Sequence, residues 1–294
     1  MRELLEAVLL GVVQGLTEFI PVSSSGHLVL APHFLGIPRG GLGFDVALHV
    51  GTFAAVLLYF WQDLRLMARA VFGVGDAVVV AFYRRLAALL LLASVPVSVV
   101  GILLEDIVEG AFASPSAAAM FLLVTGVLLL LAEAVRARRG GVRSTSPATA
   151  EETMIGHDHG DPEGLTLDRI GIRQALVIGF GQCVALFPGI SRSGSTIAAG
   201  MAVGLTRPAA TRFSFLLALP ALAGAFLVKL PDLASGASVF SPVAIAAGVA
   251  AAFVSGYLAI RWLIALVARD RLTIFAAYVF VVGLASLIAI RITP

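Results

Sequence analysis

The sequence of 294 residues is 59% hydrophobic and only 13% charged, and its mean hydropathy is +1.00. Soluble domains carry about 25% charged residues, so this composition indicates an integral membrane protein. The net charge is only +2, and the arginines lie mainly between apolar segments, which is typical of topology determinants and not of a nucleic-acid-binding surface. A single cysteine, Cys183, excludes an intramolecular disulfide and a thiolate metal cluster, which argues against redox chemistry.

The first apolar segment, GVVQGLTEFIPVSSSGHL (residues 11–28), carries polar side chains that a lipid-facing helix would not contain. Gln14 and Glu18 interrupt the apolar run and no small-residue cleavage site follows, so we do not expect a cleaved signal peptide. Pro21 and a Ser/Gly cluster then break the run before a second short apolar run begins. Broken backbone in a membrane is tolerated where protein or water satisfies its polar groups. The segment therefore predicts a re-entrant hairpin.

Six further apolar runs are long enough to cross a bilayer, which takes about 20 helical residues. They lie around residues 44–60, 86–104, 117–132, 213–228, 243–267 and 272–290. Arginines occur in the loops at 61–85, 136–139 and 269–271, whereas the loops near 105–116 and 231–241 have none. With six crossings, all arginine-rich loops fall on one face, as the positive-inside tendency requires, and both termini lie outside. If the first helix of each hairpin crossed fully, this sorting would fail.

A second copy of the first motif occurs as GFGQCVALFPGISRSGST (residues 179–196), at an offset of 168 residues. The matching pairs are Gly11 and Gly179, Gln14 and Gln182, Phe19 and Phe187, Ser23 and Ser191, Ser25 and Ser193, and Gly26 and Gly194. Three crossings in each half make the repeats inverted, so the hairpins enter from opposite faces and their tips meet mid-membrane. The sequence thus predicts an all-α integral membrane protein with six transmembrane helices plus two re-entrant helical hairpins in an inverted-topology repeat.

The one clearly polar segment, residues 136–169, separates a first membrane repeat (1–135) from a second (170–294). The positive-inside tendency makes this segment a cytoplasmic loop. Its HDHGD tract (residues 157–161) contains metal-ligand residue types, but nothing there fixes the ligand geometry that a metal requires. We therefore predict that the tract is solvated linker.

Polar groups at the first tip are candidates for function, because ionisable side chains within a membrane are costly and usually face an interior cavity. Gln14 and Glu18 are four positions apart, hence on one helix face, where they can hold a divalent cation or orient a water. The alternative is a hydrogen-bonded pair between helices. His27 follows SSSG, and a His near Ser24 suits nucleophilic or acid–base chemistry at phosphorus. His33 and His49 have no comparable polar residues near them in the sequence, and we predict that they are structural. Asp45 is predicted to be either a helix cap or a residue that contacts the site from outside it.

At the second tip, the residue types in PGISRSGST (residues 188–196) are typical of a phosphate-binding site. An arginine such as Arg192 can make bidentate contacts with phosphate, and the N-terminus of the following helix would add a favourable field. The glycine and hydroxyl residues around it are the further binding candidates Gly189, Ser191, Ser193, Ser195 and Thr196. The alternative is a structural arginine paired with Glu18 across the repeats, and the two arrangements can coexist.

The paired motifs QGLTEFIPVSSSGH (residues 14–27) and PGISRSGST (residues 188–196) resemble the signature of the bacitracin-resistance type of undecaprenyl-diphosphate phosphatase. The resemblance covers essentially the whole chain, with its repeat and interrupted hydrophobic pattern. It implies hydrolysis of the terminal phosphate of a polyprenyl diphosphate lipid in the plasma membrane, which recycles the carrier of cell-envelope synthesis. It also implies the same helical fold, often as a homodimer, and a site that opens toward the outer face.

Residue roles follow from the resemblance at the matching positions. Glu18, helped by Gln14, would support a divalent metal ion (Mg²⁺ or Ca²⁺), and Arg192 with Ser191 and Thr196 would bind the diphosphate. Ser24 and His27 would belong to the catalytic centre. The nucleophile stays open between Ser24 with His27 as base, His27 itself and a water that His27 activates.

Two other functions compete with this interpretation. A lipid flippase is one, because inverted repeats with broken helices also build transporters, although Glu18, His27 and Arg192 together exceed what binding needs. A phosphatase of the lipid-phosphate type is the other. Its downstream His after the Ser-Arg element and its upstream Lys-Arg element are both missing here.

Overall fold

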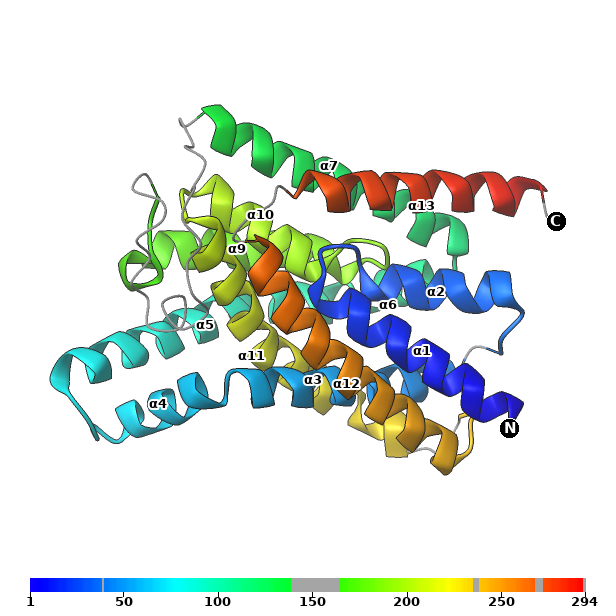
Figure 1. Cartoon of the computed structure of the whole chain (residues 1–294), viewed down its shortest axis with the longest axis horizontal. Helices are drawn as coiled ribbons and strands as arrows, with labels where there is room; N and C mark the ends of the chain where they lie inside the picture. The colour runs from blue at the N-terminus through cyan, green and yellow to red at the C-terminus, as the bar shows by residue number, and fades with distance from the viewer. Residues whose placement is uncertain (39, 139–163, 235–237, 268–271, 293–294) are drawn as a thin grey trace.

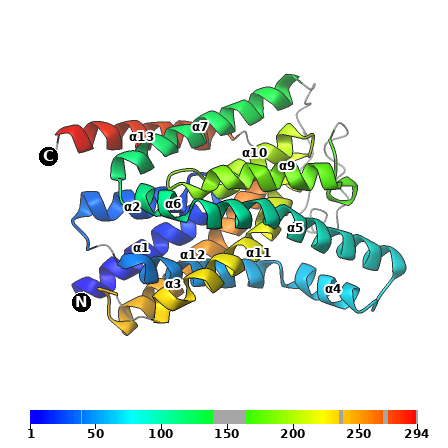
Figure 2. The same ribbon diagram turned by 180° about the vertical axis from the view of Figure 1, so that it is seen from behind.

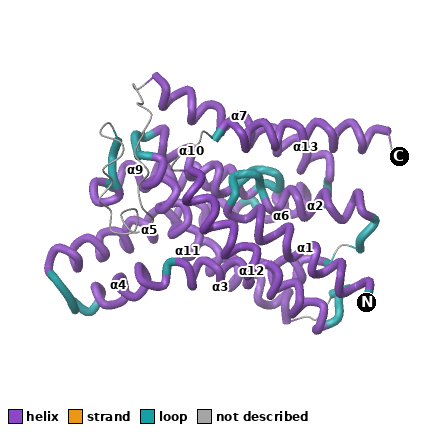
Figure 3. The backbone as a smooth tube through the Cα atoms, viewed as in Figure 1, coloured by secondary structure: helices purple, strands orange, loops and turns teal. Residues whose placement is uncertain are grey.

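The computed structural model describes residues 1–38, 40–138, 164–234, 238–267 and 272–292. Within these ranges the chain forms helices joined by short loops, and the single isolated β-bridge pairs Leu165 with Leu205 (Figure 3). The prediction of an all-α protein is confirmed.

Six long helices correspond to the six predicted crossings. They are α3 (Gly41–Tyr59), α5 (Ala77–Leu103), α7 (Pro115–Arg138), α11 (Arg207–Ala234), α12 (Pro242–Val267) and α13 (Thr273–Ile292). Five are long and apolar enough to cross a membrane alone, and α3 completes a sixth together with α4 (Trp61–Val71), to which it is bent by 73°. The protein is therefore a multi-pass membrane protein.

Helices α4 and α6 (Glu105–Phe112) lie in segments where the hydropathy pattern predicts loops. Helix α4 is amphipathic: it buries Met67 and Ala70 and carries Arg65 and Arg69 among its other residues. Charged residues lower the average hydropathy of such a short helix. A search for long apolar runs therefore does not detect this kind of helix.

The two hairpins have the predicted form. The first consists of α1 (Arg2–Phe19) and α2 (Ser24–Leu35), and the second of α9 (Ile172–Cys183), η2 (Val184–Leu186) and α10 (Arg192–Ala202). Figures 1 and 2 show the hairpins opening toward opposite ends of the molecule, so that their tips meet in the middle. A helix of 12 residues such as α2 is about 18 Å long, roughly 60% of the hydrocarbon thickness.

Equivalent glycines fix the two hairpins to equivalent partners. Helix α1 packs against α12, and α9 packs against α5. A Cβ atom on Gly11 would lie 2.2 Å from the carbonyl oxygen of Gly248, and one on Gly179 would lie 2.4 Å from that of Ala93. Small residues let membrane helices approach this closely, and the matching positions agree with the inverted repeat.

The polar segment between the repeats falls mostly outside the described residues, and so does the HDHGD tract. Helix α7 continues to Arg138, slightly beyond the predicted boundary at residue 135. The described end of the segment contains η1 (Leu167–Arg169). Arg85 of α5 donates hydrogen bonds to the carbonyl oxygens of Asp168 (2.9 Å) and Ile170 (2.5 Å), which anchors the start of the second repeat.

Candidate active site

The two tips share one hydrogen-bonded framework. Ser23 and Ser191 occupy equivalent N-cap positions, where their Oγ atoms accept hydrogen bonds from the backbone N–H groups of Gly26 (3.2 Å) and Gly194 (3.0 Å). The capping hydroxyls also lie 3.2 Å from Ser25 Oγ and 3.1 Å from Ser193 Oγ, respectively. Each tip therefore begins its second helix with the same local structure.

The tips also hold each other and are held by α7. The Oγ of Ser25 accepts a hydrogen bond from the N–H of Gly189 (3.4 Å), and the Oγ of Ser193 donates to the carbonyl oxygen of Ile20 (3.4 Å). Thr125 of α7 donates to the carbonyl oxygen of Gly189 (2.8 Å) and accepts from the N–H of Ser191 (2.9 Å). Sequence analysis did not identify Thr125, since one threonine in an apolar helix carries no local signal.

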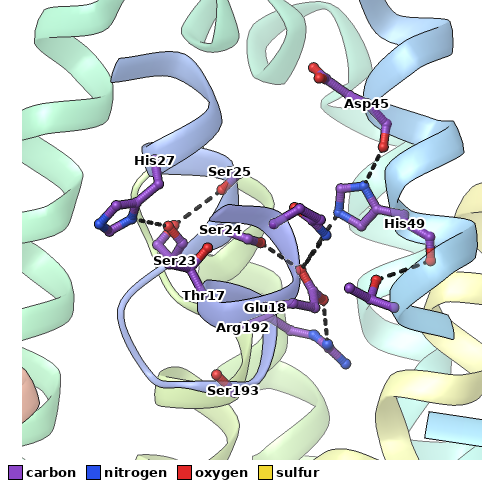
Figure 4. A network of polar contacts seen from close by, with 12 residues as sticks. Thr17, Glu18, Ser23, Ser24, Ser25, His27, Asp45, His49, Arg192 and Ser193 are labelled. Atoms are coloured by element: carbon purple, nitrogen blue, oxygen red, sulfur yellow. Dashed lines mark hydrogen bonds and ion pairs between the residues drawn. The ribbon is translucent and has the colours of Figure 1, made fainter. Parts of the chain in front are cut away.

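Glu18 lies at the centre of the side chains that the tips bring together (Figure 4). Its Oε2 atom accepts hydrogen bonds from Ser24 Oγ (2.5 Å) and Gln14 Nε2 (3.1 Å). Its Oε1 atom accepts from Arg192 Nη2 (2.6 Å), and His49 Nε2 lies 3.7 Å from Oε2. Glu18, Ser24, Gln14, Arg192 and His49 are called the Glu18 cluster below.

This arrangement prepares Ser24 for nucleophilic chemistry. The Ser24 hydroxyl donates its proton toward a buried carboxylate, which leaves an oxygen lone pair for attack. A nucleophile within hydrogen-bond reach of a base that a third group orients is the usual arrangement of covalent catalysis. Here Arg192 orients the base, Glu18.

Arg192 has one amino group bound and one available. Nη2 pairs with Glu18, as the structural alternative predicted. Nη1 is buried and has no hydrogen-bond partner among the described residues. Because an unsatisfied buried donor of a charged group is costly, Nη1 is suited to an anionic ligand.

His27 lies apart from the Glu18 cluster, on the other side of the first tip (Figure 4). Its Nδ1 donates to the carbonyl oxygen of Ser23 (2.7 Å), and its Nε2 accepts from the Tyr278 hydroxyl (2.9 Å) of α13, against whose ring the imidazole stacks. The equivalent residue Ser195 also bonds the carbonyl four residues before it, at 2.8 Å. The geometry is that of a helix-positioning group, and a catalytic role for His27 stays a prediction.

The hydroxyls predicted to bind phosphate are buried and already engaged. Ser191 caps α10, Ser193 bonds Ile20, and Thr196 Oγ1 lies 2.5 Å from Ser214 Oγ of α11. They hold the second tip in place, and their contact with a diphosphate stays a prediction. Gly189 adopts a φ of +100°, which favours glycine there.

His49 is the residue of the cluster that sequence analysis assigned to a structural role. It sits on α3 with Asp45 and Thr52, at spacings of four and three residues. These spacings place three polar residues on one face of an otherwise apolar helix. This spacing is the sequence signal that could have identified His49 as a candidate site residue.

The oxygen atoms around Glu18 offer a partial fit to a hard divalent cation. The Oε1 atom of Gln14 is buried without a partner among the described residues, and both Gln14 Nε2 and Ser24 Oγ bond Glu18 Oε2. Among the described residues no group of three or more His, Cys, Asp or Glu side chains is placed to hold a metal ion. The set suits an ion such as Mg²⁺, which keeps waters and substrate phosphate oxygens as ligands.

A family profile described as "Bacitracin resistance protein BacA" matches residues 7–285. The chain belongs to this family. A relative from Rubrobacter xylanophilus named "Undecaprenyl-diphosphatase" is 43% identical over 303 residues, covering 98% of each chain. Relatives of that name from Syntrophotalea carbinolica (44% over 281 residues, 95% of this chain and 96% of the relative) and Methanobrevibacter smithii (39% over 292 residues, 96% of each) are also similar. The match to the BacA family contains both tips and every residue of the Glu18 cluster.

Proposed function

We propose that this protein is a membrane phosphatase that hydrolyses undecaprenyl (polyprenyl) diphosphate to the monophosphate and inorganic phosphate, recycling the lipid carrier for cell-envelope synthesis. The observation that carries the proposal is that Arg192 Nη2 and the Ser24 hydroxyl bond the two oxygens of one carboxylate, Glu18, while Arg192 Nη1 is buried without a partner among the described residues. The full-length relatives named "Undecaprenyl-diphosphatase" give the substrate class.

The mechanism follows from the contacts of Ser24, Glu18 and Arg192. Ser24 Oγ attacks the terminal phosphorus in line while its proton passes to Glu18 Oε2. The bond between phosphorus and the bridging oxygen breaks, and its electron pair leaves with the polyprenyl monophosphate. Arg192 Nη1 stabilises the charge on the phosphoryl oxygens. Water then hydrolyses the phosphoserine, and Ser24 regains a proton. Glu18 thus takes the role of base, which one of the three alternatives left open by the sequence gave to His27.

A divalent ion, Mg²⁺ or Ca²⁺, would be held by Glu18 and Gln14 and would add positive charge for the diphosphate oxygens. The site would open to the outer face of the plasma membrane, as the resemblance to the family implies. The prenyl tail would lie among the helices within the bilayer. A homodimer stays a prediction from the resemblance.

The experiment that tests the proposal measures phosphate release from a C55 diphosphate by purified protein in detergent, with and without chelator. Arg192→Ala should lose about 100-fold or more in kcat/KM, the effect of removing a charged transition-state donor. Ser98→Ala, whose hydroxyl donates to the backbone carbonyl of Ser94 within α5, is the matched control and should keep full activity. Full activity in Arg192→Ala would contradict the proposal, and lipid movement without phosphate release would favour the flippase.

A further inference from the structure

Thr125 of α7 is buried, and its hydroxyl binds the backbone of the second tip. Its Oγ1 atom donates to the carbonyl oxygen of Gly189 (2.8 Å) and accepts from the N–H of Ser191 (2.9 Å). One side chain therefore holds the backbone on both sides of Ile190. These tip residues are themselves buried, and a buried backbone group that loses its partner costs about 1–3 kcal/mol. Loss of the hydroxyl would leave two such groups in one turn.

Other hydroxyl side chains in the apolar helices bond their own helix. Thr17 of α1, Ser94 of α5 and Ser255 of α12 each donate to the carbonyl oxygen four positions earlier, at 2.6, 2.8 and 2.7 Å. This is the common arrangement of serine and threonine within a helix. Thr125 instead directs both of its hydrogen bonds to another segment. Its hydroxyl therefore serves the contact with the tip and not the structure of α7.

Packing places the same turn directly against α7. Gly189 has a φ of +100°, and a Cβ atom there would lie 2.2 Å from the carbonyl oxygen of Ala118. Helix α7 is in turn fixed against α13, because a Cβ atom on Gly126 would lie 2.8 Å from the ring of Phe280. The residue next to Thr125 in the chain thus belongs to a tight contact between helices. Thr125 therefore projects from a firmly held support.

The first tip is held in an equivalent way. Tyr278 of α13 bonds His27, and His27 donates to the carbonyl oxygen of Ser23, the cap that corresponds to Ser191. Helices α7 and α13 are the last helices of the two repeats, so each tip is held by the last helix of the other repeat. Tyr278 acts through a second side chain, whereas Thr125 bonds the backbone itself.

The turn that Thr125 holds leads directly into Arg192, the first residue of α10. The Nη2 atom of Arg192 lies 2.6 Å from Glu18 Oε1, and Nη1 is the buried donor assigned above to the diphosphate. A shift of the turn would move the start of α10 and the guanidinium with it. A misplacement of about 1 Å that arises away from the reacting atoms can cost about 100-fold in rate.

We propose that Thr125 is a positioning residue for Arg192: its hydroxyl fixes the backbone of residues 189–191 so that the guanidinium reaches both Glu18 and the terminal phosphate. The inference rests on the proposed function. Thr125 contacts no reacting atom in that mechanism and acts only through the turn. If Thr125 merely stabilised the fold, its loss would lower the unfolding temperature and leave the kcat of the folded protein unchanged.

The kinetic test uses Thr125→Val, which replaces the hydroxyl by a methyl group of similar size. The kcat/KM for the C55 diphosphate should fall about 100-fold, mostly in kcat, because Nη1 would act on charge that develops in the transition state. Thr125→Ser restores the hydroxyl and should keep most of the activity. Ser94→Ala, which removes a buried hydroxyl from α5, is the control and should keep full activity. Unchanged kcat in Thr125→Val, or an equal loss in Thr125→Ser, would overturn the proposal.

A double-mutant cycle tests whether Thr125 acts through Arg192. Residues that act through one another give non-additive losses, whereas independent residues give additive ones. Thr125→Val combined with Arg192→Ala should therefore lose about as much kcat/KM as Arg192→Ala alone. Fully additive losses would show that Thr125 acts elsewhere and would overturn the proposal.

A third measurement is independent of turnover. NMR of isotope-labelled arginine follows the guanidinium of Arg192, whose signal is identified by its absence in Arg192→Lys. The signal should change in Thr125→Val and stay as in wild type in Thr125→Ser; an unchanged signal in Thr125→Val would contradict the positioning role. If wild type released no phosphate, the proposed function would fall, and this measurement would still decide whether Thr125 positions Arg192. Thr125→Cys, whose thiol is a weak donor, replaces Thr125→Val if the latter does not fold, with smaller changes in the same direction.

Discussion

Helices α2 and α10 begin with the same cap, but the residue after the capping serine differs: Ser24 in α2 and Arg192 in α10. Glu18 of the first hairpin likewise corresponds to Leu186 of the second. In the proposed mechanism one scaffold therefore supplies the nucleophile and the base, and its inverted copy supplies the cation. The two tips have similar backbones but different side chains. Because the tips meet, these different side chains form one site.

The backbone of the two tips differs at the cap itself. Ser23 has a φ of +71°, whereas Ser191 has a φ of −70°. A positive φ in a residue other than glycine costs about 1–3 kcal/mol and is found most often at functional sites. The strain is confined to the tip that carries Ser24, where it turns the start of α2 toward Glu18.

The largest expected effect concerns the residue that distinguishes the two tips. Ser24→Ala should reduce kcat by about 1000-fold or more, since removing a nucleophile removes the covalent route. Phosphate release from the C55 diphosphate measures it. Ser25→Ala, which removes the contacts of Ser25 Oγ with Gly189 and Ser23, should lose far less activity. Equal losses in the two variants would show that Ser24 has no special role.

The next effect should be equal in the two hairpins. Gly11→Ala and Gly179→Ala each place a Cβ atom against a backbone carbonyl that cannot move aside, so each should destabilise the protein by about 1–3 kcal/mol. Thermal unfolding in detergent measures the loss. Gly36→Ala, on the open end of α2, meets no atom within 4 Å but has a φ of +63°, so it separates backbone strain from overpacking. If only one of the two variants lost stability, the two hairpins would not pack equivalently against their partner helices.

The third comparison uses the equivalent glutamines. Gln14→Ala should raise the concentration of Mg²⁺ or Ca²⁺ needed for half-maximal activity by about 10-fold, in the range seen when groups that support a metal site are removed. Gln182→Ala should leave this concentration unchanged, because its partner position is Leu186 and not a carboxylate. The same shift in both variants would contradict a metal site at Glu18.

The smallest effect tests the strained cap. Ser23→Gly should raise stability by about 1 kcal/mol, because glycine relieves the strain of a positive φ. Ser191→Gly should lower it by about 0.3 kcal/mol, since the cap is lost with no strain to relieve. Chemical unfolding of both variants beside wild type measures the difference. A loss in Ser23→Gly as large as in Ser191→Gly would show that the Ser23 backbone is relaxed.

The sequence predicted the six crossings, the two hairpins and the meeting of their tips, because each depends on hydropathy, arginine position or a repeated motif. It also predicted the Glu18–Arg192 pair as one alternative. The sequence did not show which of the two histidines, His27 or His49, lies beside Glu18. His27 is close to Glu18 in the chain, yet the first turn of α2 directs it to Tyr278 of α13, while α3 brings His49 back to the carboxylate. Contacts between distant helices depend on their rotation and crossing, which no local pattern encodes.

The meeting of the two tips between the ends of the molecule has an electrical consequence. A site at mid-membrane lies partway through the transmembrane voltage, and moving one elementary charge across 100 mV is worth about 2.3 kcal/mol. For a site that opens outward in a cell with a negative interior, a diphosphate that reaches the tips moves against part of this field. Turnover in sealed vesicles should therefore slow as the interior is made more negative. Protein in detergent feels no such field.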